Sequence, residues 1–247
     1  MSEAEHFYDH FAPEEWKRLE RHRTEFAVTL KAFDEFLPSP PCTILDIGGG
    51  PGRYSIELAR QGYSVTLLDI SRESLRLARE KTGEAQVSLT GFSHSNAVDL
   101  SELDSASFEA VLLMGPLYHL LSREERVQAI REAMRVLIPS GRLFATFITR
   151  FAPFRYAARD DPAWFVENRE YALRVLETGV HDQSKKFAQT HFARPEEVVP
   201  LMEICGAKSL ALIGCEGIVS GHEDSKSTAT IFNTGGVGTC TCLANNV

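Results

Sequence analysis

Residues 45–54 read Leu45-Asp46-Ile47-Gly48-Gly49-Gly50-Pro51-Gly52-Arg53-Tyr54, and this stretch carries the strongest structural signal in the chain. A short apolar run of buried-strand type leads into glycines at alternate positions, and a helical pattern follows. Glycine lets the main chain contact a ligand and tolerates positive φ. The helix after the loop is expected to direct free N–H groups at an anionic group of that ligand. A turn without a ligand would need only one or two glycines, so the stretch predicts a binding site.

Outward from this loop, strand and helix patterns alternate along the chain. We expect further strands at residues 64–69, 86–90, 108–114 and 142–149, separated by helices at 54–60, 71–81 and 122–138. Strands that alternate with helices form βαβ units, which place the strands side by side and parallel. The expected fold class is therefore α/β, a Rossmann-like doubly wound and mostly parallel sheet with an N-terminal helical segment and an insertion after strand five.

The flanking segments are less regular. Residues 1–10 are expected to be a mobile lead, and an amphipathic helix is expected to open at Pro13 and to end at the linker Pro38–Pro41. A final helix opens at Pro195, and a sixth strand covers residues 208–213. After Ser220 the composition is rich in Ser, Thr, Gly and Asn and predicts a tail, in which residues 228–232 are the candidate edge strand.

Composition limits the classes of partner. The chain has 247 residues and a formal net charge of -8, which argues against nucleic acid as the main partner. No apolar run approaches the roughly 20 residues that cross a bilayer. The acidic N-terminus has no apolar core, so a secretory signal is not expected, and we expect a cytoplasmic protein. The five cysteines are odd in number and lack a C-x-x-C pair, which favours reduced thiols and no metal site.

Asp69 ends the second expected strand, 21 positions after Gly48. A carboxylate about 20 residues beyond such glycines lies at the tip of the neighbouring strand and can accept hydrogen bonds from both hydroxyls of a ribose. NAD-binding proteins share this feature with other nucleoside-binding proteins. Asp69 therefore indicates a nucleoside without selecting the class of ligand. The structural alternative is a helix N-cap beside Ser71.

The pattern D-x-G-x-G-x-G that starts at Asp46 resembles the first motif of the class I S-adenosylmethionine-dependent methyltransferases. A dinucleotide fingerprint, G-x-G-x-x-G/A, would instead place Arg53 or Ser55 where a small residue packs helix on strand. The loop at residues 115–120 and the stretch at 135–143 resemble those of the small-molecule, ubiquinone/menaquinone-biosynthesis-like group. In the latter stretch Ser140 replaces a glycine. The resemblance covers roughly residues 43–149.

The resemblance implies a set of site residues. Asn96 stands where the family commonly has an acid that holds the adenine amino group, and Asp99 three positions on is the alternative. Phe7 and Tyr8 are expected to form a lid over the adenosine, or else to belong to a disordered tail. The cofactor-binding residues are then expected to be Tyr8, Asp46, Gly48, Gly50, Gly52, Asp69, Ile70, Asn96, Ala97, Met114 and Gly115.

His119 is the first candidate for a general base, with Tyr118 beside it, because the unperturbed pKa of histidine lies near neutrality. His119 could equally pack under the cofactor or cap the next helix. His181 and His191 are expected to be solvated loop residues. The eight aromatic residues of the insertion at 150–194 either line an apolar pocket or form the insertion's own small core.

The resemblance divides the chain by task. We expect one domain over residues 1–219, followed by an atypical tail at 220–247. Inside the domain, residues 1–41 would form a helical lid or cap, and 42–149 the cofactor-binding core. Residues 150–194 would form the insertion on the acceptor side, and 195–219 the final helix and strand.

The expected function is methyl transfer from S-adenosylmethionine, without a metal, to an oxygen, nitrogen, sulfur or carbon atom of a small organic acceptor. Two alternatives stay open: an NAD(P)-dependent oxidoreductase and a non-catalytic binding module that keeps the fold. The common short-chain oxidoreductase pattern Tyr-x-x-x-Lys is absent. The sequence indicates neither the acceptor nor the oligomeric state.

Overall fold

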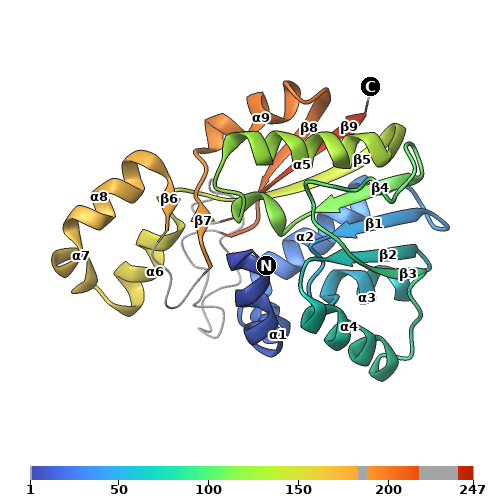
Figure 1. Cartoon of the computed structure of the whole chain (residues 1–247), viewed down its shortest axis with the longest axis horizontal. Coiled ribbons are helices and arrows are strands. Elements are labelled where there is room, and N and C mark those ends of the chain that lie inside the picture. The colour runs from blue at the N-terminus through green and yellow to red at the C-terminus, as the bar shows by residue number, and fades with distance from the viewer. Residues whose placement is uncertain (1, 183–187, 217–238, 247) are drawn as a thin grey trace.

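The computed structural model describes residues 2–182, 188–216 and 239–246. Its centre is a seven-stranded sheet in the order β3-β2-β1-β4-β5-β9-β8 (Figure 1). The strands from β3 to β5 run parallel, and β9 runs antiparallel to both of its neighbours. The bounds are β1 Thr43–Ile47, β2 Ser64–Asp69, β3 Gly91–His94, β4 Phe108–Leu113, β5 Leu137–Ile148, β8 Ala207–Gly214 and β9 Thr239–Asn246. The expected fold class is confirmed.

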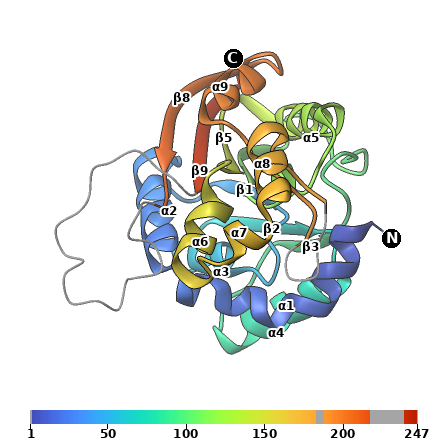
Figure 2. The same ribbon diagram turned by 90° about the vertical axis from the view of Figure 1, so that its left-hand side faces the viewer.

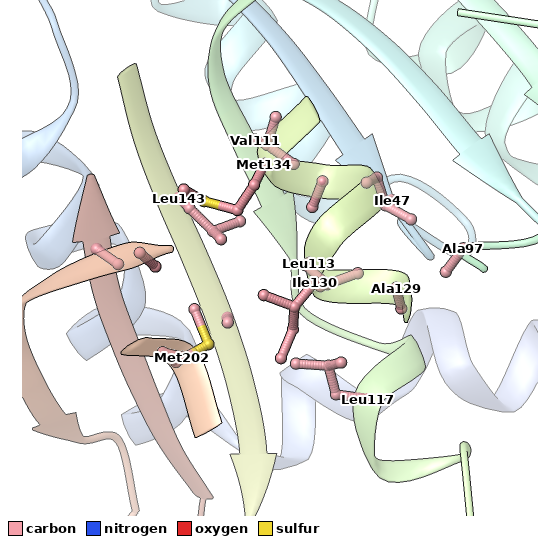
Figure 3. Packing of buried hydrophobic residues seen from close by; sticks show 14 of the residues in the cluster. Ile47, Ala97, Val111, Leu113, Leu117, Ala129, Ile130, Met134, Leu143 and Met202 are labelled. Carbon is pink, nitrogen blue, oxygen red and sulfur yellow. The ribbon is translucent and has the colours of Figure 1, made fainter. Parts of the chain in front are cut away.

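Helices cover both faces of this sheet. One face packs on α5 (Arg123–Val136) and α9 (Pro195–Glu203). The other face packs on α2 (Arg23–Phe36), α3 (Arg53–Arg60) and α4 (Arg72–Glu84). Figure 3 shows the first of these contacts, where the apolar side of α5 lies over Val111 and Leu113 of β4. Burial of apolar side chains on both faces fixes the strand ends that carry the loops.

The strand order reverses next to β1, which pairs with β2 on one side and β4 on the other. Connections leave β1 and β4 toward opposite faces of the sheet, so a crevice opens beyond the carboxyl ends of these strands. The glycine loop follows β1, and the 3-10 turn η1 (Pro116–Tyr118) follows β4. Both loops that the sequence singles out therefore meet at one crevice.

The N-terminal segment differs from the sequence prediction. Helix α1 covers Glu3–Arg21, so residues 2–10 are helical rather than a mobile lead. Its first turn is closed by a capping box, in which Ser2 and Glu5 bond each other's main-chain N–H groups. Pro13 lies inside α1 instead of opening it, and the helical segment is divided at His22. The capping box explains how an acidic, weakly apolar segment becomes ordered.

Two strands also differ from the prediction. The third strand forms at Gly91–His94, beyond the predicted 86–90, because its pairing with β2 selects the register. The chain after Ser220 does not end as a tail only: Thr239–Asn246 forms β9, between β5 and β8. The candidate edge strand at 228–232 lies outside the described residues. Ser140 adopts φ +63, which explains why related sequences carry glycine there.

The insertion after β5 is mainly helical. It contains α6 (Ala152–Asp160), α7 (Trp164–Glu167), α8 (Arg169–Thr178) and a small hairpin of β6 (Val180–His181) and β7 (Thr190–His191). These helices lie at the end of the molecule toward which the parallel strands point (Figures 1 and 2). Among the described residues, no helix has the length and apolar character needed to cross a membrane.

Candidate active site

A cavity of about 420 Å³ lies in the crevice beyond β1, β2 and β4. This volume lies within the range of about 300–1,000 Å³ that is usual for small-molecule sites. Ten of the eleven expected cofactor-binding residues line it; the exception is Gly52. Those that line it are Tyr8, Asp46, Gly48, Gly50, Asp69, Ile70, Asn96, Ala97, Met114 and Gly115.

The glycine loop forms the floor of the cavity. Gly48 has φ +71, and a Cβ atom there would lie 2.6 Å from Cδ of Pro116. Gly52 also has positive φ, +85, but it caps α3 and faces the side chain of Leu67, which a Cβ atom would approach to 3.1 Å. Gly48 therefore allows the loop to pack closely against η1, whereas Gly52 allows the helix to pack on the sheet.

The main-chain amides of Gly48, Gly49 and Gly50 form hydrogen bonds within the protein. The N–H groups of Gly48 and Gly49 donate to the carbonyl of Leu68, at 2.7 and 3.2 Å. The N–H group of Gly50 donates to Oδ2 of Asp69 at 2.8 Å. These bonds tie the loop to the end of β2. The three glycine amides are therefore not available to an anionic ligand group.

Asp69 ends β2 and is 6% exposed. Its Oδ2 accepts from Gly50, and its Oδ1 accepts from the N–H of Ser71 at 2.8 Å. Two oxygens offer about four lone-pair directions, so two remain for the hydroxyls of a ligand. Burial raises the pKa of the Asp69 carboxyl to about 6. Ser71 itself caps α4, so Asp69 is not the helix cap that was the structural alternative.

Asp46 lies under the loop, 2% exposed. Its Oδ2 accepts a hydrogen bond from the hydroxyl of Ser55 at 2.6 Å, which links β1 to α3. Burial raises the pKa of Asp46 to about 6, in spite of the bond from Ser55. Two buried carboxyls, Asp46 and Asp69, therefore share the floor of the cavity and favour a cationic or hydroxyl-bearing ligand.

Asn96 and Asp99 separate in the structure. Asn96 lines the cavity, and its Oδ1 accepts from the N–H of Val98 at 3.2 Å. Asp99 does not line it, and its Oδ1 accepts from the N–H of Ser101. Of the two candidates, Asn96 is the one placed to meet a ligand, with its amide group donating or accepting.

His119 follows η1 and is held at both ring nitrogens. Its Nδ1 donates to the carbonyl of Gln189 at 2.9 Å, because a carbonyl can only accept. Its Nε2 then accepts from the hydroxyl of Tyr8 at 2.7 Å. Burial lowers the pKa of His119, which favours the neutral ring. Burial raises the pKa of Tyr118 above its usual value, so that its hydroxyl stays protonated. Of the two side chains, His119 is therefore the one whose neutral form has an unprotonated ring nitrogen.

Helix α1 forms the roof. Its residue Asp9 accepts from the hydroxyl of Ser71 at 2.7 Å, which fixes α1 to the start of α4. Tyr8, Glu15 and Arg18 all line the cavity from this helix. Arg18 pairs with Glu15 at 2.6 Å and with Glu25 at 2.7 Å.

Sequence reasoning missed Glu15 and Arg18, which it placed on an amphipathic helix without giving them a role in the site. Their signal was the spacing from Tyr8, because steps of seven and three residues place all three side chains on one helix face.

The insertion contributes less to the cavity than one of its two interpretations expected. Among the described residues of 150–194, only Gln189 lines the cavity, and it is not aromatic. Trp164 contacts Tyr171, whose hydroxyl meets the ring of His181 in a short hydrogen bond. This favours the insertion's own core. His181 and His191 lie in β6 and β7 and are not solvated loop residues; burial lowers the pKa of both, that of His191 to about 4.

The doubly wound sheet, the bare loop after β1 and the carboxylate at the tip of β2 define an α/β protein that binds a nucleoside in its crevice. Comparison with known proteins specifies the family. The family model described as a methyltransferase domain matches residues 44–141. The ubiquinone biosynthesis O-methyltransferase of Ralstonia nicotianae is 30% identical over 173 residues, which is 70% of this chain and 66% of that protein, just under two thirds.

Solved structures agree on the fold. An S-adenosylmethionine-dependent methyltransferase of Methanosarcina mazei has a TM-score of 0.63 at 22% identity, and covers 87% of this chain and 97% of its own. Another, from Thermotoga maritima, has a TM-score of 0.64 at 18% identity, and the match covers 98% of this chain and 99% of that one. Residues 44–141 therefore belong to a methyltransferase domain of the class I S-adenosylmethionine-dependent type, a family that implies S-adenosylmethionine as cofactor.

Proposed function

We propose that this protein transfers a methyl group from S-adenosylmethionine to a nucleophilic atom of a small organic acceptor. The observation that carries the proposal is the single cavity wall that joins the glycine loop, Asp69 and Asn96 to His119. The first three suit a nucleoside, and the last is a buried base. Residues suited to the cofactor and a base suited to the acceptor therefore lie in one cavity. The cofactor supplies a methyl group that is already activated on sulfur.

The residues fit the cofactor group by group. Asp69 has lone pairs left for the two ribose hydroxyls, and Asn96 meets the adenine edge. The methionine half would pass over Gly48 and Gly50, which line the cavity without side chains. Arg18 lines the cavity and offers a guanidinium to a carboxylate, a role that the occupied loop amides cannot fill. Asp46 and Asp69 add negative charge near a cationic sulfonium.

His119 holds a proton-transfer role in this proposal. The bond from Nδ1 to Gln189 fixes the tautomer, so that the lone pair of Nε2 faces the cavity side, where Tyr8 donates to it. An acceptor hydroxyl or amine that takes the place of the Tyr8 hydroxyl would pass its proton to Nε2. The lowered pKa keeps Nε2 unprotonated at neutral pH. Helix α1 and the loop before α5 exclude water from the same space.

The oxygen specificity of the curated relatives is the starting point for the acceptor. The Ralstonia protein is named a ubiquinone biosynthesis O-methyltransferase, and we propose a hydroxylated small molecule as the first class to test. Residues 150–194 would bound the acceptor side, 42–149 the cofactor side, and 1–41 the lid. We further propose a cytoplasmic protein that does not act on nucleic acid, which cell fractionation and a nucleic-acid binding assay would test.

Calorimetric titration with S-adenosylmethionine and S-adenosylhomocysteine tests the cofactor half. We expect one site per chain. Transfer of an isotopic methyl label to compounds of a cell extract tests the reaction. Tight binding of NADH in place of S-adenosylhomocysteine would support an oxidoreductase instead. Cofactor binding without label transfer to any compound would support a binding module.

A further inference from the structure

A second cavity, of about 650 Å³, lies next to the first. It is bounded by the start of α5, the start of α9, the end of α8 and His191 of β7. The two cavities share a wall at residues 120–121: Leu120 and Leu121 line the first, and Arg126, which lines the second, donates to both of their carbonyls at 2.6 and 2.9 Å. The mechanism above uses none of the second cavity.

Four arginines line this cavity, and the two deepest are almost fully buried. Arg126 is 7% exposed and Arg150 is 5% exposed. Arg123 and Arg194 lie at the exposed mouth. Buried guanidinium groups cannot lose their charge, so each needs hydrogen-bond acceptors.

The acceptors that the protein supplies satisfy this need only in part. Nε of Arg126 is buried and has no hydrogen-bond partner. Arg150 donates to the carbonyls of Phe192, Leu176 and Glu177, and its Nη2 forms an ion pair of 3.8 Å with the exposed Glu197.

Two positive side chains of the second cavity are buried, whereas its negative side chains are exposed. The acidic side chains that line it, Glu177, Glu196 and Glu197, are all exposed. The floor therefore has two buried cations and no buried carboxylate among the described residues. His191 faces the same floor: burial, and then the charges of Arg126 and Arg150, lower its pKa to about 4. At neutral pH the imidazole is uncharged and offers one further N–H.

We propose that this second cavity binds the phosphate group of a small molecule, or free phosphate, on Arg126 and Arg150, with Arg123 and Arg194 at its mouth. Arginine presents planar pairs of N–H groups that match the oxygens of phosphate, and a partly desolvated site strengthens each bond. Since Arg126 also holds the carbonyls of Leu120 and Leu121, an occupant would brace the wall that the two cavities share.

Titration of the whole protein with inorganic phosphate and with glycerol phosphate, at constant ionic strength, tests this proposal. We expect saturable binding with a dissociation constant of about 1 mM or below for at least one of them. Preference for glycerol phosphate assigns the site to a phosphomonoester, and equal affinity to free phosphate. The titration is repeated with saturating S-adenosylhomocysteine, and binding that persists places phosphate outside the cofactor cavity.

Variants locate the site. Arg123→Gln is expected to weaken phosphate binding about threefold, and Arg123→Gln with Arg194→Gln about tenfold. Arg131→Gln, an exposed arginine of α5 that does not line the cavity, is the matched control and should leave binding unchanged. Arg126→Gln should abolish binding, and its thermal unfolding shows whether it folds. No saturable binding, competition by S-adenosylhomocysteine, or equal loss in Arg131→Gln would overturn the proposal.

Discussion

The floor and the roof of the cofactor cavity are built in different ways. The floor is main chain and short side chains at the ends of β1 and β2, where hydrogen bonds from Gly48 and Gly50 lock the loop to its neighbours. The roof is a single helix, α1, held by side-chain contacts such as those of Asp9 with Ser71 and Tyr8 with His119. The floor is therefore tied by main-chain hydrogen bonds, whereas the roof depends on side chains alone.

Because floor and roof are built differently, we expect mutations in them to have different effects. A change in the floor alters the shape of the binding surface and the fold together, because the sheet provides both. A change in the roof alters mainly the closure of the cavity and the environment of His119.

Gly48→Ala should have the largest effect. A Cβ atom would lie 2.6 Å from Pro116, in a backbone conformation that disfavours side chains, so unfolding free energy should fall by ~2–4 kcal/mol. Urea denaturation measures it. Gly83→Ala in α4 is the matched control, because a Cβ atom there meets nothing within 4 Å. Equal stability of the two variants would show that the floor is not rigid.

Asp69→Asn should weaken binding of S-adenosylhomocysteine by ~1.5–3 kcal/mol, because it removes a charged acceptor from the ribose site. Calorimetry measures the loss. Asp34→Asn, an exposed carboxylate of α2, is the control and should bind as the unmodified protein does. Unchanged affinity in Asp69→Asn would contradict the assignment of the ribose to the tip of β2.

Cofactor binding should depend on pH through the floor. Burial raises the pKa of Asp69 and of Asp46 to about 6, so both gain protons as pH falls through this value. A ribose hydroxyl and a sulfonium prefer the ionised forms. Affinity should therefore be full above about pH 7 and fall, well below pH 6, by up to about tenfold per pH unit for each carboxyl, or about a hundredfold for the two together. The same titration on Asp69→Asn should give a shallower profile, and a flat profile in the unmodified protein would refute the role of these carboxyls.

Tyr8→Phe should have the smallest effect on cofactor affinity, about 1 kcal/mol or less, since one roof hydrogen bond is lost. Loss of the donor to Nε2 should raise the pKa of His119 and move the acid limb of the methyl-transfer profile to higher pH. Tyr118→Phe is the comparison, because its hydroxyl donates to Met114 and not to His119. An acid limb that moves equally in both variants would exclude the bond from Tyr8 as its cause.

The difference between floor and roof also explains which features of the site could be predicted from the sequence. The loop around Gly48 and the acid at Asp69 were found because their geometry is set by neighbouring residues in the chain. The hydrogen bonds of the Gly48, Gly49 and Gly50 amides were not predicted, because their acceptors, Leu68 and Asp69, come from the adjacent strand. The site role of Arg18 depends on where a whole helix docks, which no local pattern encodes.

Strand β9 is the clearest case of an element that could not be predicted from the local sequence. Its sequence, Thr-Cys-Thr-Cys-Leu-Ala-Asn-Asn, has weak strand character, and composition placed it in a tail. Pairing with β5 on one side and β8 on the other supplies the hydrogen bonds that local preference does not. Position in the sheet, rather than propensity, orders these residues.

The location of β9 has a consequence for biosynthesis. Residues 239–246 form β9, which lies between β5 and β8. Until residue 246 has left the ribosome, β5 and β8 therefore lack β9 as their pairing partner. During translation β5 exposes an unpaired edge of a kind that promotes association between chains. A chaperone that shields this edge, or rapid completion of synthesis, would determine how much of the protein reaches its native state.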